Sequence, residues 1–175
     1  MKVILSLVLT LALAVPALAQ RRQSTNRGGS SSDVMRLTYD LGASAGSYGG
    51  VDYSEINLGL NWYFADWIAW RNAVFARQGT GQSTAGLDTS IRFEYNNRGP
   101  DFGMKAFAGP GYRFASKSMS AAFAEAGLIF HFGGLAIGAG AKSMHYSNPG
   151  EDSRGTALPR QDTSFFLILG GGGVL

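Results

Sequence analysis

Hydrophobic and polar residues alternate along much of this chain. In the run VMRLTYDLGASAG, residues 34–46, the apolar residues occupy every second position, and polar residues or glycine stand between them. The run SEINLGLNWYF, residues 54–64, repeats the pattern with larger apolar side chains. Because successive side chains of a β-strand point to opposite faces, this period of two predicts strands with one apolar and one polar face.

Six further segments extend the pattern and bring the expected number of strands to eight; they span residues 67–77, 87–96, 102–114, 121–132, 135–147 and 163–175. Short connections (ADW, NRGPD, GG) alternate with longer ones near SYGGVD, QGTGQSTAG, ASKSMS and NPGEDSRGTALPRQD. Tight turns at one end and longer loops at the other are typical of outer-membrane barrels. The sequence predicts an all-β fold, an eight-stranded antiparallel transmembrane β-barrel, with local weakening or a bulge at Pro110.

Charged residues on the polar faces support the barrel. They come from seven of the expected strands and carry both signs: Arg36, Asp40, Glu55, Arg71, Arg92, Glu94, Lys105, Arg113, Glu125 and Lys142. An eight-stranded barrel has an interior just wide enough for side chains, so such charges are expected to pair there. The alternative is a soluble β-sandwich that exposes them to water. Three Trp residues around the first short turn (62, 67 and 70) favour the membrane, because aromatic girdles lie at its boundary.

The N-terminus predicts export to the bacterial outer membrane. MKVILSLVLTLALAVPALA, residues 1–19, has the basic start, apolar run and Ala-x-Ala ending of a signal peptide. We expect a flexible periplasmic linker at 20–32 and the barrel at 33–175. The chain has no cysteine, so it relies on neither disulfides nor thiolate metal sites. No cofactor, metal or nucleic-acid partner is expected.

The stretch HYSNPG, residues 145–150, contains the candidate chemistry. Alternation from Leu135 through Ala141 continues to His145 and Ser147, which predicts that both side chains face the lipid of the outer leaflet. A hydroxyl beside an imidazole is the minimum for nucleophilic attack on an ester, and Asn148 and Gly150 follow as candidate donors to an oxyanion. The alternative is an ordinary polar strand end with an Asn-Pro-Gly turn.

This stretch resembles the His-x-Ser-Asn-x-Gly signature of the outer-membrane lipid A 3-O-deacylases, the PagL family. The resemblance implies an eight-stranded barrel that acts on lipid A of the lipopolysaccharide, with His145 as base, Ser147 as nucleophile, and Asn148 with Gly150 as oxyanion hole. The family carries a Glu shortly before its last strand, whereas this chain has ALPRQDTSFFLIL there. Asp162 is the nearest acid and is the expected partner of His145; an alignment on Thr163 or Ser164 would leave no carboxylate.

Two readings of function therefore stay open. One is a lipid A esterase that needs no cofactor, and the other is a non-enzymatic small outer-membrane barrel of the OmpA or OmpX type with a structural or adhesive role. Homodimer formation is open in both. Cations expected at the outer rim offer contacts to lipid A phosphates; they are Arg77, Lys117, Arg154 and Arg160.

Overall fold

A computed structural model of the chain describes residues 36–79, 82–98, 102–116, 119–133, 135–149, 151, 155 and 157–171. The expected signal peptide at 1–19 and linker at 20–32 lie outside the described residues. The described residues include no helix that is long and apolar enough to cross a membrane.

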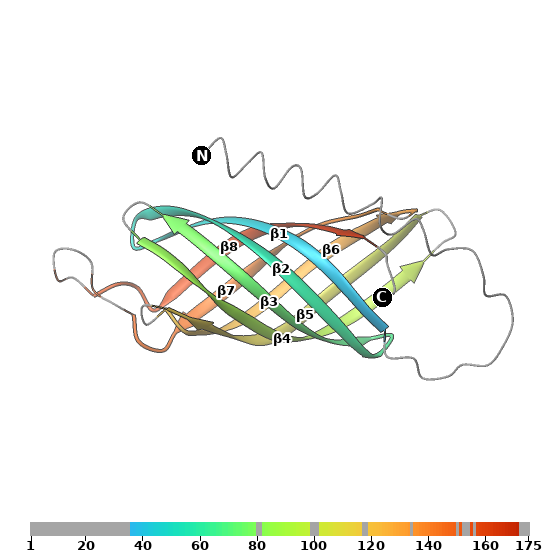
Figure 1. Ribbon diagram of the computed structural model, residues 1–175, viewed down its shortest axis with the longest axis horizontal. Coiled ribbons are helices and arrows are strands. Elements are labelled where there is room, and N and C mark those ends of the chain that lie inside the picture. The colour runs from blue at the N-terminus through green and yellow to red at the C-terminus, as the bar shows by residue number, and fades with distance from the viewer. Residues whose placement is uncertain are drawn as a thin grey trace, which may run out of the picture.

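Eight antiparallel strands form a closed barrel, as the alternation predicted. Each strand pairs with its neighbours in chain order, and β8 pairs with β1 to close the ring. Figure 1 shows the strands tilted around a common axis. The strands are β1 (Arg36–Tyr48), β2 (Val51–Ala65), β3 (Ile68–Gly79), β4 (Gln82–Arg98), β5 (Phe102–Ala115), β6 (Ala121–Phe132), β7 (Leu135–Tyr146) and β8 (Gln161–Gly171).

The barrel has two unlike ends. The turn end has the connections 66–67, 99–101 and 133–134, and the loop end has 49–50, 80–81, 116–120 and 147–160. The expected long loop QGTGQSTAG is mostly strand, because β3 and β4 continue to the pair Gly79–Gln82. The turn at Gly49 and Gly50 is also tight, since both residues have positive φ (61° and 78°), as a two-residue hairpin turn of type I′ requires.

Pro110 weakens the ladder but makes no bulge. The pairing of β4 with β5 skips Pro110 and Gly109, yet the register is the same on both sides of the gap. On its other edge Pro110 pairs with Ala124 of β6. The register shift that the structure does contain lies between β2 and β3, at Tyr63 and Ala65.

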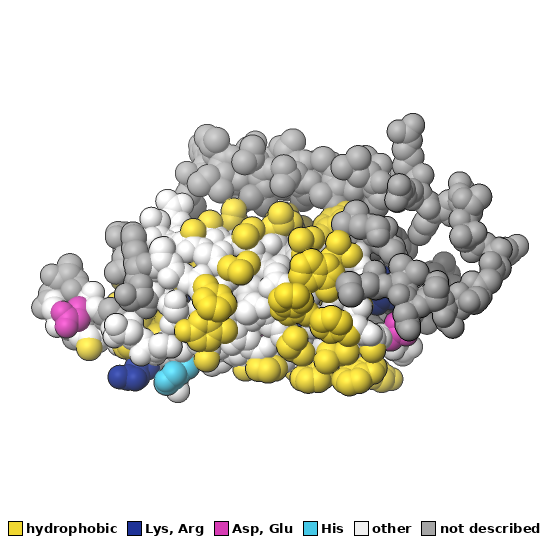
Figure 2. Space-filling model, turned by 60° about the horizontal axis from the view of Figure 1, so that its bottom comes forward, with side chains coloured by type: hydrophobic (Ala, Val, Ile, Leu, Met, Phe, Trp, Pro, Cys, Tyr) yellow, Lys and Arg dark blue, Asp and Glu magenta, His cyan; other side chains and the backbone are white. Residues whose placement is uncertain are grey.

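The outer surface is apolar around the barrel. Many large side chains lie exposed, among them Phe165 (70%), Leu167 (62%) and Trp67 (59%). Rings gather near the turn end, where Trp62 lies 5.0 Å from Trp70 and Phe102 lies 5.4 Å from Phe132, measured between ring centroids. Figure 2 shows these apolar side chains spread over the barrel wall. A water-soluble monomer rarely exposes such a continuous apolar surface, and lipid would cover it.

The interior contains the predicted charges. All of the ten residues listed above are buried except Arg36, which is half-buried. Arg113 is 1% exposed and bridges two carboxylates, at 2.7 Å from Glu55 and 2.7 Å from Asp88. Lys142 adds a 2.7 Å ion pair to Asp88 from the far side of the barrel. Because buried charges are tolerated only when paired, this network is what lets the interior be polar.

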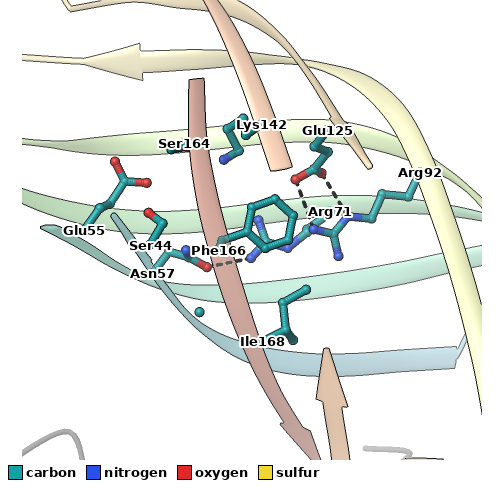
Figure 3. Close-up of a pocket in the computed structure, with 11 residues that line it drawn as sticks. Ser44, Glu55, Asn57, Arg71, Arg92, Glu125, Lys142, Ser164, Phe166 and Ile168 are labelled. Atoms are coloured by element: carbon teal, nitrogen blue, oxygen red, sulfur yellow. Dashed lines mark hydrogen bonds and ion pairs between the residues drawn. The ribbon is translucent and has the colours of Figure 1, made fainter. Parts of the chain in front are cut away.

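Side chains from several strands pack together in the middle of the described part of the barrel. Figure 3 shows side chains from several strands converging on one space, with Arg92 bonded to Glu125 and Arg71 bonded to Asn57. The cavity left between them is about 10 Å³, room for roughly one water molecule.

Replacing Arg113 by Met should destabilise the barrel strongly. The substitution leaves Glu55 and Asp88 buried with fewer cations, and removing one partner of a buried pair costs about 3 to 5 kcal/mol. Urea unfolding in lipid vesicles, followed by Trp fluorescence, measures this loss. The control is Arg36→Met, which removes a rim pair of 3.8 Å to an exposed Asp66 and should cost about 1 kcal/mol or less. Equal losses in the two variants would contradict a stabilising role for the interior network.

Candidate active site

The loop end of β7 presents its polar residues on the outer face. Met144 and Tyr146 point inward and are 1% and 0% exposed. Ser143, His145 and Ser147 alternate with them and are exposed on the outside of the barrel. The structure thus places the imidazole and the hydroxyl on the same face, the face that the apolar side chains of the barrel share.

Backbone pairing continues to Ser147, beyond the last residue of β7. The Ser147 N–H donates to the Ser120 carbonyl at 3.2 Å, and the Tyr146 N–H donates to the Arg160 carbonyl at 2.8 Å. Residues that are two positions apart on a strand are separated by about 6.6 Å, so the side chains of His145 and Ser147 are close enough to contact each other. The structure records no hydrogen bond between these two described side chains.

The donors expected for an oxyanion are partly described. Asn148 follows Ser147 directly and is exposed, so its amide groups are free to face a substrate. The Ser147 N–H is already bonded to Ser120, so it is not available for that role. Gly150 lies outside the described residues.

Asp162 does not lie beside His145, which corrects the expectation from the sequence. Asp162 pairs in register with the inward-facing Met144, and it is 4% exposed inside the barrel. Its carboxylate accepts hydrogen bonds from Tyr53 at 2.7 Å and from Tyr146 at 3.2 Å. Since the barrel wall separates this carboxylate from the outward imidazole, Asp162 cannot orient His145 in this conformation.

Asp162 instead joins strands behind the site. With Tyr53, Arg77 and Tyr146 it forms what we term the Asp162 cluster, in which Arg77 lies 3.3 Å from Asp162 and 3.0 Å from the Tyr146 hydroxyl. The Tyr48 hydroxyl above it donates to the Pro159 carbonyl at 2.8 Å and so ties the end of the 147–160 connection to the barrel mouth. These contacts hold β7 and β8 in a fixed register directly inside His145 and Ser147.

The outward residues of β8 near the site are Gln161 and Thr163. Gln161 pairs in register with His145, and Thr163 pairs with Ser143. Both are exposed, whereas Ser164 is buried inside. Gln161 carries no charge, so a search of the sequence for an acid does not find it. The register of the β7–β8 pair identifies it as the residue opposite His145.

The expected rim cations are distributed differently. Arg77 is 7% exposed and lies inside, so it is not available to bind phosphate. Lys117 and Arg154 lie outside the described residues. Arg160 is exposed, next to Gln161 in the chain. Figure 2 shows a histidine at the surface of the loop end, beside a Lys or Arg side chain and near the edge of the apolar surface.

Neither a metal centre nor the larger surface depression competes with this site. Among the described residues, no three His, Asp or Glu side chains are grouped as metal ligands. A depression of about 460 Å³ lies at the loop end of β2, β3 and β4, with Ser54, Gln78 and Ser83 among its lining residues. It lies across the barrel from β7 and contains no histidine to activate a hydroxyl. The candidate chemistry therefore lies on β7.

Seven chains of solved structures match this chain, although the sequence matches no protein-family model and no curated protein. The crystal structure of the outer membrane enzyme PagL aligns with a TM-score of 0.51 at 15% identity, over 74% of this chain and 97% of that chain. A chain from de novo design of transmembrane β-barrels aligns with a TM-score of 0.46 at 14% identity, over 76% and 94%. What this chain shares with the PagL structure is the fold, that of an eight-stranded transmembrane β-barrel.

Proposed function

We propose that this protein is an outer-membrane esterase that removes the ester-linked 3-hydroxyacyl chain at position 3 of lipid A. The observation that carries the proposal is the exposure of His145 and Ser147 on the apolar outer face of β7. A lipid lies against such a surface, so a lipid ester can reach both side chains. The resemblance of HYSNPG to the lipid A 3-O-deacylase signature indicates which ester bond is cleaved, the one at position 3 of lipid A.

The orientation of the barrel supports the outer leaflet as the site of action. Outer-membrane barrels keep short turns in the periplasm and longer loops outside. The 147–160 connection is the longest in this chain, and it follows β7 directly. His145 and Ser147 then lie in the leaflet that holds lipopolysaccharide.

The chemistry follows from a hydroxyl and a base. His145 takes the proton of Ser147, and the Ser147 oxygen attacks the ester carbonyl of the acyl chain. Asn148 donates hydrogen bonds to the resulting oxyanion. The imidazolium then protonates the ester oxygen of the sugar as its bond to the acyl carbon breaks, which releases the sugar hydroxyl and leaves the acyl group on Ser147. Water, deprotonated by His145, hydrolyses that acyl-enzyme and releases a 3-hydroxy fatty acid.

A non-enzymatic barrel is the second candidate, and one observation favours it. No carboxylate lies opposite His145 among the described residues, because its register partners are Ala122 and Gln161. A small closed barrel without a working triad would act through its stability and its loops.

Ser147→Ala should abolish deacylation, because it removes the nucleophile. Mass spectrometry of lipid A from a Gram-negative host expressing each variant measures the loss of one 3-hydroxyacyl chain. Ser143→Ala is the matched control, since Ser143 flanks His145 on its other side, on the same strand and face. It should leave deacylation intact. Full activity of Ser147→Ala, or loss of activity in Ser143→Ala alone, would reject Ser147 as nucleophile.

Asp162→Asn should lower stability and leave the chemical step nearly unchanged. The variant weakens the hydrogen bonds from Tyr53, Tyr146 and Arg77, and bonds to a charged group are worth about 2 kcal/mol. Urea unfolding gives the stability, and initial rates on lipid A in detergent micelles give kcat. A large fall in kcat with unchanged stability would show that Asp162 takes part in catalysis.

A further inference from the structure

We propose that Gln161 is the residue that orients His145, in the role that the sequence had assigned to an acid. As a statement about catalysis, this rests on the proposed esterase function. As a statement about the histidine ring, it stands on the geometry of the β7–β8 pair alone.

The register brings the two side chains together. His145 and Gln161 are directly opposite residues of the antiparallel pair, and both are exposed on the outer face. The next pair along, Tyr146 and Arg160, is joined by a 2.8 Å backbone hydrogen bond. Because hydrogen-bonded and non-hydrogen-bonded pairs alternate, His145 and Gln161 form a non-hydrogen-bonded pair, with Cα atoms about 4.5 Å apart. This is the arrangement in which opposite side chains lie closest.

The residue opposite His145 on its other edge offers no acceptor. On β6 the opposite residue is Ala122, which has no polar side-chain atom. Thr163 lies one pair further along β8 on the same face, a diagonal separation of about 7 to 8 Å. Ser147 is needed as the nucleophile. Among the described residues, Gln161 is thus the neighbour whose side chain can reach the ring across the strand pair.

The Asp162 cluster keeps this pair in place. Tyr146 and Asp162 follow His145 and Gln161 in the chain, and their side chains bond to each other at 3.2 Å inside the barrel. A slip of the register by one residue would break that bond and turn Gln161 inward. The buried cluster therefore fixes which β8 side chain faces His145.

An amide can supply half of what an acid supplies. The Gln161 Oε1 atom accepts the proton of His145 Nδ1, which leaves the Nε2 lone pair for Ser147. An asparagine orients the histidine of papain-like proteases in the same way. Unlike a carboxylate, the amide does not neutralise the imidazolium that forms during the reaction. We therefore expect a slow enzyme that Gln161→Glu accelerates.

The first test measures the tautomer of the His145 ring in the absence of substrate. The sequence contains two histidines, so ¹⁵N-histidine NMR of the full chain in nanodiscs gives two ring signals, and His145→Ala identifies them. The neutral His145 ring should be mainly the Nδ1–H form. Gln161→Leu should convert it mainly to the Nε2–H form, which free histidine favours. Gln78→Leu, an exposed glutamine at the loop end of β3 across the barrel, should change nothing.

The second test reads catalysis. Gln161→Leu should lower kcat at least about tenfold with little change in KM, and Gln161→Glu should raise kcat by about the same factor, because orienting groups act on the chemical step. Gln78→Glu controls for an added negative charge at the membrane surface and should leave kcat unchanged.

The two tests separate the two proposals. A ring tautomer that responds to Gln161→Leu in a protein that cleaves no lipid A would uphold the role of Gln161 and reject the esterase. Ser147-dependent cleavage with a tautomer and a kcat indifferent to Gln161 would uphold the esterase and overturn the role of Gln161.

Discussion

Lipid offers no hydrogen-bond partners to a backbone, so a sheet that crosses a membrane must pair every strand edge with another. In this protein the pairing of β8 with β1 meets that requirement, and the rest of the structure follows from it. A closed ring of eight strands encloses a narrow space that side chains must fill. Because the outside is apolar, the polar half of each alternating strand has to be inside, where the charges satisfy one another.

The same alternation decides which residues can work together. Two residues on neighbouring strands share a face only if they are directly opposite or are offset from that pairing by an even number of positions. No side chain passes through the wall. His145 and Asp162 fail this condition, although they are close along the β7–β8 hairpin. His145 and Gln161 meet it. The buried charges of the Asp162 cluster therefore hold β7 and β8 in register behind His145, and the barrel wall separates them from its imidazole.

The sequence predicted the fold well because seven of the strands alternate clearly. It also predicted the outward face of His145 and Ser147, since the alternation of Leu135 to Ala141 runs on without a break. It failed at Asp162, because FFLIL in β8 is apolar on both faces: Phe166 and Ile168 pack inside while Phe165, Leu167 and Leu169 face outward. Because this run does not alternate, the sequence does not show whether Asp162, just before it, points into the barrel or outward. It also misplaced Arg77, because polar residues at 78–86 looked like a loop where the strands in fact continue.

The proposed function requires the barrel to hold His145 and Ser147 at the depth of the ester bonds of the outer leaflet. The chain has no cysteine, so single cysteines at 143, 145 and 147 can each carry one spin label. Power-saturation EPR in vesicles compares collisions with oxygen, which enriches in lipid, and with a water-soluble nickel chelate. We predict lipid exposure at all three positions, with 147 near the headgroups and 143 roughly 10 Å deeper, given four residues of a tilted strand. Frequent collisions of the labels at 145 and 147 with the nickel chelate, and rare collisions with oxygen, would place both residues in water and exclude a site at the depth of the lipid ester bonds.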